Sequence, residues 1–185
     1  MLDRAAGTGD LVGMLTLSLL RHAKSNWEDR ELGDHERPLA KRGARDAPRI
    51  GALLAERDWI PDLIVCSGAV RARATVTLML SQLGAARPAI IFDDALYLAE
   101  PPALLGRIAL IESAHRHVML VGHNPGLHAL ALAMTGSGDR KQLAQLALGF
   151  PTAGLAVIDF DAVSWDEITA GAGRLRAFVT PRRID

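Results

Sequence analysis

Four side chains of this sequence could together bind and transfer a phosphoryl group. Arg21 and His22 follow one short apolar run, Arg71 comes shortly after a second, and His123 follows a third. A guanidinium group is planar and permanently charged, and its donors match the oxygens of a phosphoryl group. A neutral imidazole can attack phosphorus and hold it as a phosphohistidine, which splits one displacement into two. Taken alone, Arg21 also fits a solvated strand-end cation and His22 a capping residue, so the chemistry depends on the fold that positions them.

The apolar runs have the length and composition of buried strands. Residues 15–20 are too few and too apolar for an amphipathic surface helix, and they fit a strand buried on both faces. Helical patterns separate the first four runs. The predicted strands are Leu15–Leu20, Leu63–Cys66, Ala89–Phe92, His117–Val121, Gly154–Phe160 and Arg174–Val179. The predicted helices cover residues 39–57, the stretch from the turn after Cys66 to residue 83, about a dozen residues from Pro101, and residues 127–134.

This alternation predicts a three-layer α/β/α sandwich with a mostly parallel central sheet. The last two strands are separated by a Gly-rich turn, which allows antiparallel pairing. Residues 137–149 are expected to form a loop and a short helix. Pro48 lies inside the first helical pattern and predicts a kink or a separate first turn there.

The ends of three predicted strands should meet at one place. The carboxyl ends of parallel strands lie at the same edge of an open sheet, where such sheets bind ligands. Arg21, His22, Arg71 and His123 all follow such ends, so we expect them to form one anion site. The turn after Cys66 also leads into a helix, whose N-terminal N–H groups and positive dipole end favour an anion.

Composition limits the remaining possibilities. The 185 residues include 21 basic and 21 acidic side chains, so no overall field favours nucleic acid or an anionic membrane. No apolar run approaches the ~20 residues that span a bilayer. We expect a flexible leader over residues 1–13, with translation starting at Met1 or Met14, and one domain over residues 14–185 in a cytoplasmic protein without a cofactor.

The motifs together resemble the histidine phosphatase superfamily, in its phosphoglycerate-mutase-like branch, from residue 15 to about residue 159. Within it the chain is most similar to the small SixA-type phosphohistidine phosphatases. The resemblance rests on Arg21-His22-Ala23-Lys24-Ser25, Arg37-Pro38-Leu39 with Lys41-Arg42-Gly43, Ser67 with Arg71 and Thr75, Leu96-Tyr97, and Val121-Gly122-His123-Asn124-Pro125-Gly126. It implies a phosphoglycerate mutase-like fold and a hydrolase.

The resemblance also implies roles for single residues. His22 would be the phosphorylated nucleophile, and Arg21, Arg71 and His123 the other members of the phosphate pocket. The sequence departs from the family where Ala23 replaces a glycine and Ala74 a glutamine. Lys24 and Arg37 are further candidates for substrate binding, each also readable as a solvated loop residue. Trp27 and Trp59 are predicted to be packing residues, with the rim of the pocket as the alternative position for Trp27. The predicted surface or strand-start residues are His35, His115, His117 and His128.

The general acid is not fixed by the sequence. Larger relatives carry a carboxylate soon after the third strand, where this chain has Glu100. Glu100 also fits a solvated acid before a helix, and Asp34 and Glu36 in the polar loop compete for the role. An imidazole leaving group, with a pKa of ~6.5, departs more easily than an alkoxide and needs less help from an acid. No long insertion roofs the pocket, which suits a bulky partner. These points favour a phosphohistidine protein as substrate, with a small phosphate monoester as the alternative.

Four other interpretations remain. A Cys-based phosphatase needs an arginine six residues after the cysteine, but position 72 is alanine, so Cys66 fits a buried thiol better. A metal site is disfavoured, because the histidines lack ligand spacing and two arginines would repel a cation. A non-catalytic phosphate-binding module would not need His22. Mutase activity is disfavoured by the short chain.

Overall fold

The computed structural model describes residues 14–184, so the predicted leader over residues 1–13 lies outside the described residues. The strands are β1 (Met14–Arg21), β2 (Leu63–Cys66), β3 (Ala89–Phe92), β4 (His117–Gly122), β5 (Thr135–Gly138), β6 (Leu155–Asp161) and β7 (Gly173–Val179). The helices are α1 (Lys41–Glu56), α2 (Val70–Leu80), α3 (Pro101–Ala109), α4 (Gly126–Met134) and α5 (Arg140–Leu148). Short 3-10 helices cover Asp34–Glu36, Asp94–Leu96, Trp165–Glu167 and Pro181–Arg183.

The strands form one seven-stranded sheet in the order β3-β2-β4-β1-β6-β7-β5. β6 runs antiparallel to β1 and to β7, whereas the other neighbouring pairs are parallel. The predicted mostly parallel sheet is therefore confirmed, and so is the antiparallel pairing of the last two predicted strands. β1 lies in the middle of the sheet, and its residues 15–20 are buried on both faces, as the apolar run predicted.

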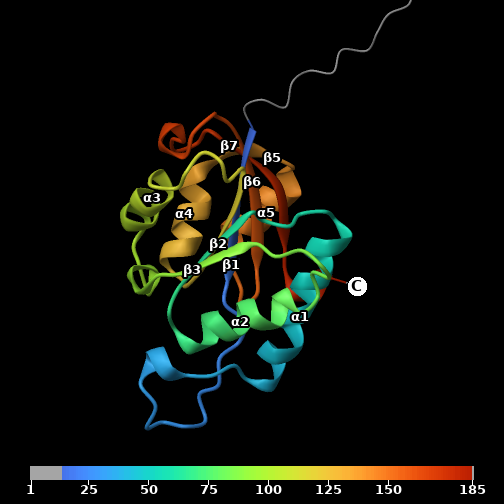
Figure 1. Ribbon diagram of the computed structural model, residues 1–185, viewed down its shortest axis with the longest axis vertical. Coiled ribbons are helices and arrows are strands. Elements are labelled where there is room, and N and C mark those ends of the chain that lie inside the picture. Colours follow the sequence, from blue (N-terminus) through green and yellow to red (C-terminus); the bar gives the residue numbers. More distant parts are fainter. Residues whose placement is uncertain (1–13, 185) are drawn as a thin grey trace, which may run out of the picture.

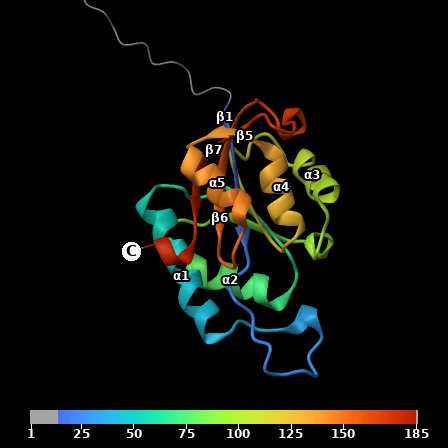
Figure 2. The same cartoon turned by 180° about the vertical axis from the view of Figure 1, so that it is seen from behind.

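Helices cover both faces of the sheet (Figures 1 and 2). α1 and α2 pack on one face over a core that includes Leu54, Val76 and Met119. α3, α4 and α5 pack on the other face, over a core around Leu17, Leu120 and Phe160. The adjacent residues of β1 alternate between these two cores, because side chains of a strand point to opposite faces in turn. The sandwich has the three layers that the sequence predicts. None of the helices in the described part of the chain is long and apolar enough to span a bilayer.

Two local predictions were wrong. Residues 135–138 form β5, which pairs parallel with β7 at the edge of the sheet, although residues 137–149 were expected to begin with a loop. The segment is Thr-Gly-Ser-Gly and carries no apolar alternation, so its pairing depends on the backbone. α1 also runs through Pro48 as one helix, which contradicts the separate first turn, whereas the kink stays a prediction. Proline has no N–H, so Pro48 leaves the carbonyl group of Ala44 without its partner in the helix. Ala44 is exposed, so this carbonyl group lies on the solvent side of α1.

The close contact between α1 and α2 gives a direct test of the packing. A Cβ atom at Gly51 would lie 2.1 Å from the carbonyl oxygen of Met79, whereas one at Gly106 of α3 would meet nothing within 4 Å. We expect Gly51→Ala to destabilise the fold by about 1–3 kcal/mol, because the two helices must move apart. Gly106→Ala should instead stabilise it by about 0.5–1 kcal/mol. Urea unfolding measures both changes, and equal effects of the two substitutions would contradict this packing.

Candidate active site

The carboxyl ends of β1, β2 and β4 lie side by side and bring the predicted residues together. Arg21 is level with Gly122 of β4, and Cys66 at the end of β2 is level with Val121. The residues that follow these ends line one cavity of about 280 Å³. Its lining contains Arg21, His22, Arg71 and His123, together with Lys24, Ser25, Trp27, Asp34, Leu98, Asn124 and Thr152.

A hydroxyl joins the turn after β1 to α2. The N–H of Ala23 donates to the hydroxyl oxygen of Thr75 at 3.0 Å, and that hydroxyl donates to the carbonyl oxygen of Arg71 at 2.7 Å. Ala23 and Thr75 are both fully buried. The turn that carries His22 is thereby fixed relative to the helix that carries Arg71.

The guanidinium group of Arg71 is the centre of the site. Its side chain is buried, and its Nε donates to Nε2 of His22 at 3.2 Å. Its Nη2 donates to Oδ2 of Asp34 at 2.8 Å and to Nδ1 of His123 at 3.3 Å. Its Nη1 donates to the backbone oxygen of Asp34. One planar cation thus orients two imidazoles and one carboxylate.

His22 is held neutral, with its Nε2 unprotonated. Its Nδ1 lies 2.7 Å from the carbonyl oxygen of Ala23, which can only accept, so the proton is on Nδ1. Nε2 then faces the donor of Arg71 as an acceptor. Burial lowers the pKa of His22 from 6.5 to about 4, and the charges of Arg71 and Arg21 act in the same direction. A neutral imidazole with an unprotonated nitrogen in the cavity is the form that can attack phosphorus.

His123 is the second neutral imidazole. Its Nδ1 accepts from Arg71, and its Nε2 donates to the hydroxyl oxygen of Ser67 at 2.7 Å. Burial, with smaller contributions from His22 and Arg71, lowers the pKa of His123 from 6.5 to about 3. The rings of His22 and His123 are 5.0 Å apart. Ser67, which belongs to the turn after β2, therefore fixes the orientation of a residue from the turn after β4.

Arg21 presents an unused donor. Its Nη1 donates to the carbonyl oxygen of Phe150 at 2.9 Å, and Nδ2 of Asn124 donates to the same oxygen. Within residues 14–184, its buried Nε has no hydrogen-bond partner. Burial lowers the pKa of Arg21, and the charge of Arg71 contributes to this shift. An anion between the two guanidinium groups would satisfy the donor and reduce their mutual repulsion.

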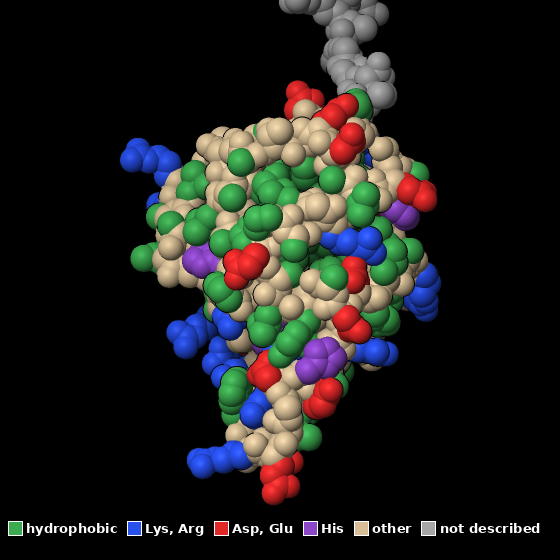
Figure 3. All heavy atoms as spheres, turned by 90° about the vertical axis from the view of Figure 1, so that its left-hand side faces the viewer, with side chains coloured by type: hydrophobic (Ala, Val, Ile, Leu, Met, Phe, Trp, Pro, Cys, Tyr) green, Lys and Arg blue, Asp and Glu red, His purple; other side chains and the backbone are tan. Residues whose placement is uncertain are grey.

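Backbone contacts join the two ends of the polar segment between β1 and α1. The N–H of Asn26 donates to the carbonyl oxygen of Pro38, Ser25 and Leu39 form an isolated antiparallel bridge, and the N–H of Ala40 donates to Lys24. This segment forms the narrow lower end of the molecule in Figure 1, and Figure 3 shows acidic, basic and histidine side chains gathered there.

Asp34 lies in the middle of that segment and is ionised in the site. The hydroxyl of Tyr97 donates to Oδ2 of Asp34 at 2.6 Å and, together with Arg71, lowers the pKa of Asp34. The same hydrogen bond raises the pKa of Tyr97. Tyr97 also lies edge-on to His123, with ring centroids 5.2 Å apart. From the sequence, Asp34 is a candidate acid and Tyr97 is part of the family resemblance, but no spacing rule predicted that the two side chains are in contact.

Trp27 takes the alternative position, at the rim of the cavity, rather than the predicted packing position. Its side chain is 59% exposed and lines the cavity, and the guanidinium of Arg37 lies 4.2 Å from its ring centroid. Arg37 does not line the cavity; its Nε lies 3.7 Å from Oδ1 of Asp34. His35, predicted as a surface residue, packs edge-on against Tyr97. Arg37 and His35 thus contact residues of the site rather than the cavity itself.

Lys24 and Glu100 differ in their placement. Lys24 is exposed and lines the cavity. Glu100 is an exposed residue directly before α3, and it is absent from the lining of the cavity. Asp34, one of the competing loop acids, is the carboxylate in that lining.

The structure also bears on the two rival chemistries. Cys66 is fully buried, and burial raises its pKa to about 12, so the thiolate that a Cys-based phosphatase requires is disfavoured. Across residues 14–184, no three His, Cys, Asp or Glu residues are grouped so that they could hold a metal ion.

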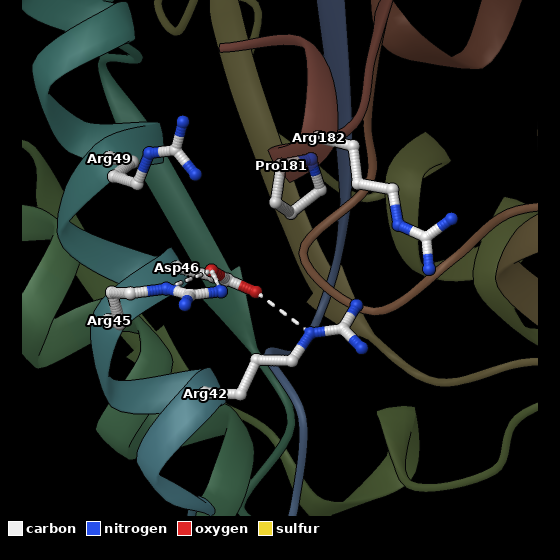
Figure 4. Close-up of a pocket in the computed structure, with 6 residues that line it drawn as sticks. All are labelled: Arg42, Arg45, Asp46, Arg49, Pro181 and Arg182. Carbon is white, nitrogen blue, oxygen red and sulfur yellow. Dashed lines mark hydrogen bonds and ion pairs between the residues drawn. The ribbon is translucent and has the colours of Figure 1, made fainter. Parts of the chain in front are cut away.

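A second cavity, of about 580 Å³, lies between α1 and the turn at Pro181 and Arg182 and shares none of these residues (Figure 4). Arg42, Arg45 and Arg49 of α1 line it with Arg182, and the buried Asp46 accepts hydrogen bonds from Arg42 and Arg45. It contains no histidine or other nucleophile, so the chemistry described here belongs to the smaller cavity.

The buried histidines predict a pH dependence of stability. An unfolded histidine has a pKa near 6.5, whereas His22 and His123 have values of about 4 and about 3 in the fold. As the pH falls below 6.5, the unfolded chain takes up protons that the folded chain does not, so folding stability should fall towards pH 4. The double variant His22→Gln, His123→Gln should lose less stability over this range. Urea unfolding at several pH values measures the slopes, and equal slopes would contradict the shifted pKa values.

Comparison with known proteins gives related chains over most of this length. A model of the histidine phosphatase superfamily (branch 1) matches residues 17–97. An uncharacterized protein of Mycobacterium leprae is 35% identical over 167 residues, which cover 88% of this chain and all of the relative.

Two solved structures share this fold. A protein of Agrobacterium tumefaciens, assigned as the phosphohistidine phosphatase SixA, has a TM-score of 0.76 and 36% identity, and the match covers 90% of this chain and 98% of the other. A protein of Nakamurella multipartitia with the same assignment also has a TM-score of 0.76, at 26% identity over 93% of this chain and 99% of its own.

Proposed function

This chain belongs to the histidine phosphatase superfamily, and on that basis we propose that it is a phosphatase whose nucleophile is His22. The observation that carries the proposal is the neutral His22 with Nε2 turned towards Arg71 in a cavity that Arg21 also lines. A phosphoryl group in this cavity would place its oxygens against two guanidinium groups and its phosphorus near Nε2. Such preorganised cations stabilise charge on the transferring oxygens without reorganisation during the reaction.

The proposed reaction has two displacements at phosphorus. In the first, the lone pair of His22 Nε2 forms an N–P bond while the bond from phosphorus to the leaving group breaks, and the leaving group departs with the electron pair. In the second, a water oxygen bonds to phosphorus, the N–P bond to His22 breaks, and inorganic phosphate and a proton are released. Lys24 lines the same cavity and would donate to a phosphoryl oxygen, and His123 would orient the guanidinium group of Arg71 through Nδ1.

The acids of the site support a phosphohistidine as the substrate. Asp34 is the carboxylate in the cavity lining, but Tyr97 and Arg71 lower its pKa, so it carries no proton to donate near pH 7. Glu100 is exposed and outside that lining. A phosphorylated imidazole that is protonated on its other nitrogen leaves as neutral imidazole and needs no such donor, unlike an alkoxide.

The surroundings of the cavity support a protein as the bearer of that phosphohistidine. Trp27 and Leu98 line the cavity with largely exposed side chains. A neighbouring apolar groove shares Arg21 and Asn124 with it and is lined by Leu148, which is largely exposed, and Pro151. Exposed apolar side chains beside a polar pocket are typical of protein contact surfaces. Two of the similar solved structures are assigned as phosphohistidine phosphatases.

A small-molecule phosphate monoester is the alternative substrate. The observation that favours it is the carboxylate of Asp34 inside the cavity, because binding of a dianionic phosphate near Arg71 would compete for the cation that keeps this acid ionised. Asp34 would then be the donor to an alkoxide leaving group. The two substrate classes therefore differ in whether the reaction needs a protonated Asp34.

We expect His22→Ala to abolish turnover and to remove a phosphorylated intermediate. In the wild-type protein, rapid acid-free quenching during turnover of a labelled substrate should trap phosphate in the peptide that contains His22. His115→Ala is the matched control, because His115 lies before β4 and outside the lining of both the cavity and the neighbouring groove, and it should keep both the turnover and the label. Label that persists in His22→Ala, or near-normal turnover by this variant, would refute the nucleophile. Phosphate binding without any turnover by the wild type would indicate a non-catalytic module.

Glu100→Gln separates the possible acids. Removal of a working general acid slows a reaction by ~10²–10⁴-fold, so a loss of less than about tenfold on a phosphate monoester would exclude Glu100 from this role. We expect such a small loss, and a still smaller one on a phosphohistidine protein. The same panel should show that the wild type hydrolyses phosphohistidine and phosphoramidate faster than monoesters. A strong preference for monoesters would shift the substrate class to small phosphate esters.

A further inference from the structure

Four arginines line the cavity between α1 and the turn at Pro181 and Arg182, which we call the arginine cavity. Arg42, Arg45 and Arg49 follow one another on α1 at intervals of three and four residues, so they share one face of the helix. Arg182 belongs to the 3-10 helix Pro181–Arg183, which packs beside α1 (Figure 2). Figure 4 shows the arginines of α1 on one side of the cavity and Arg182 on the other. Two segments far apart in the sequence therefore bring four permanent cations together.

A buried carboxylate orients two of these arginines. Asp46 is only 2% exposed, and its Oδ2 accepts from Nε of Arg42 at 3.3 Å. Its Oδ1 accepts from Nε and Nη2 of Arg45 at 3.2 and 3.1 Å. Within residues 14–184, both Nη atoms of Arg42 and Nη1 of Arg45 form no hydrogen bond to the protein. The two guanidinium groups are thus held in advance, with donors that remain available to a ligand.

The arginine cavity carries more positive charge than the described residues neutralise. In residues 14–184, Asp46 is the only carboxylate in the lining, against four guanidinium groups. Arg49 donates to the backbone oxygen of Ile184, and in this part of the chain neither Arg49 nor Arg182 forms an ion pair. Like charges four positions apart on a helix also lower its stability. An anion that contacts several of the arginines would offset this repulsion and use their donors.

We propose that the arginine cavity binds a small molecule with two or more linked phosphoryl groups. Two guanidinium groups in bidentate contact can already occupy the terminal oxygens of one phosphoryl group, whereas this cavity offers four. The arginines of α1 extend over about 10 Å of the helix axis, since each residue adds about 1.5 Å, and this exceeds the length of one phosphoryl group. The volume of about 580 Å³ lies in the range of small-molecule sites.

The lining also indicates which part of such a molecule is recognised. Besides the arginines and Asp46 it contains Pro181, and none of the described residues that line the cavity is aromatic. A nucleobase would find no aromatic ring to stack on, so the cavity recognises the phosphoryl chain, whether inorganic or part of a nucleotide. A nucleic acid is disfavoured, because 21 basic and 21 acidic residues balance over the whole chain and no overall field attracts a long polyanion.

Calorimetric titration with methylenediphosphonate tests the proposal. This probe joins two phosphoryl groups through carbon, so a phosphatase does not cleave it during the titration. We expect saturable binding that weakens as salt is added, because the contacts are between exposed or partly exposed charges. Inorganic phosphate should bind the arginine cavity more weakly by about tenfold or more, because it contacts fewer of the guanidinium groups.

A double variant assigns the binding to the arginine cavity. Arg49→Gln with Arg182→Gln removes two of the four cations and leaves both arginine partners of the buried Asp46 in place. We expect it to weaken the binding of methylenediphosphonate by about tenfold or more, because charge-assisted contacts to the phosphoryl oxygens are lost. Circular dichroism checks that this variant is folded. Arg182→Gln alone, at an exposed residue of the 3-10 helix, retains the test if the double variant is not.

Two controls separate this binding from net charge and from the candidate active site. Arg140→Gln with Arg174→Gln removes the same charge from exposed residues outside both cavities, and it should leave the binding unchanged. Arg71→Gln should also retain the binding to the arginine cavity, because Arg71 lines only the other cavity.

Two further ligands distinguish an inorganic source from a nucleotide. The α,β-methylene analogue of ADP should bind with an affinity comparable to that of methylenediphosphonate, and adenosine should not bind. Tighter binding of the analogue, with no binding of adenosine, would support the phosphoryl chain as the recognised group and identify a nucleotide as its source.

Four outcomes would overturn the proposal. These are no binding of methylenediphosphonate by the wild type, equal binding by the two double variants, equal affinity for inorganic phosphate, and binding of adenosine alone. A hexaglutamate peptide that binds where methylenediphosphonate does not would show that the cavity serves an acidic protein segment instead. None of these measurements depends on turnover, so the proposal and the proposed function can fail separately.

Discussion

The site depends on one buried guanidinium group and on the acceptors that it requires. A fixed cation that is only 4% exposed must have its donors satisfied, and Arg71 uses His22, His123 and both the side chain and the backbone of Asp34. An imidazole can accept from Arg71 only if it is neutral at the accepting nitrogen. The same contact that satisfies Arg71 therefore keeps both histidines unprotonated. The nucleophilic form of His22 follows from the burial of its neighbour as much as from its own burial.

For a phosphohistidine substrate, the first chemical step would exchange one N–P bond for another. The leaving imidazole and the attacking imidazole have similar basicity, so the two N–P bonds would differ little in free energy. The protein would then accelerate the step mainly by positioning the two groups. The contacts of this site are of that kind. Carbonyl, hydroxyl and guanidinium partners set both ring orientations, and the hydrogen bonds of Thr75 fix the turn after β1 to α2.

The strand ends could be predicted from the sequence, whereas the segments between them could not. Three short apolar runs fit only buried strands: Leu15–Leu20, Leu63–Cys66 and His117–Val121. Parallel pairing of these strands then places the residues that follow them, Arg21, His22 and His123, at one edge of the sheet. Asp34 and Trp27 lie in a polar segment without periodicity, so nothing local determined where their side chains point. The contact of Asp34 with Tyr97 spans 63 positions and depends on the whole fold. β5 was missed because glycines hold it to β7 through the backbone alone.

The closed base of the segment between β1 and α1 has a consequence for how such a chain can diverge. The backbone contacts between residues 24–26 and 38–40 bring the two ends of the segment together. A change in the length of the segment therefore need not move the strand and helix that it joins. Insertions at its exposed outer part, around residues 28–31, would reshape the surface next to Trp27 at the cavity and leave the strand ends unmoved. Selection could therefore change what the protein recognises while the groups proposed to bind phosphate stay fixed, so descendants of this architecture could separate by specificity long before they separate by chemistry.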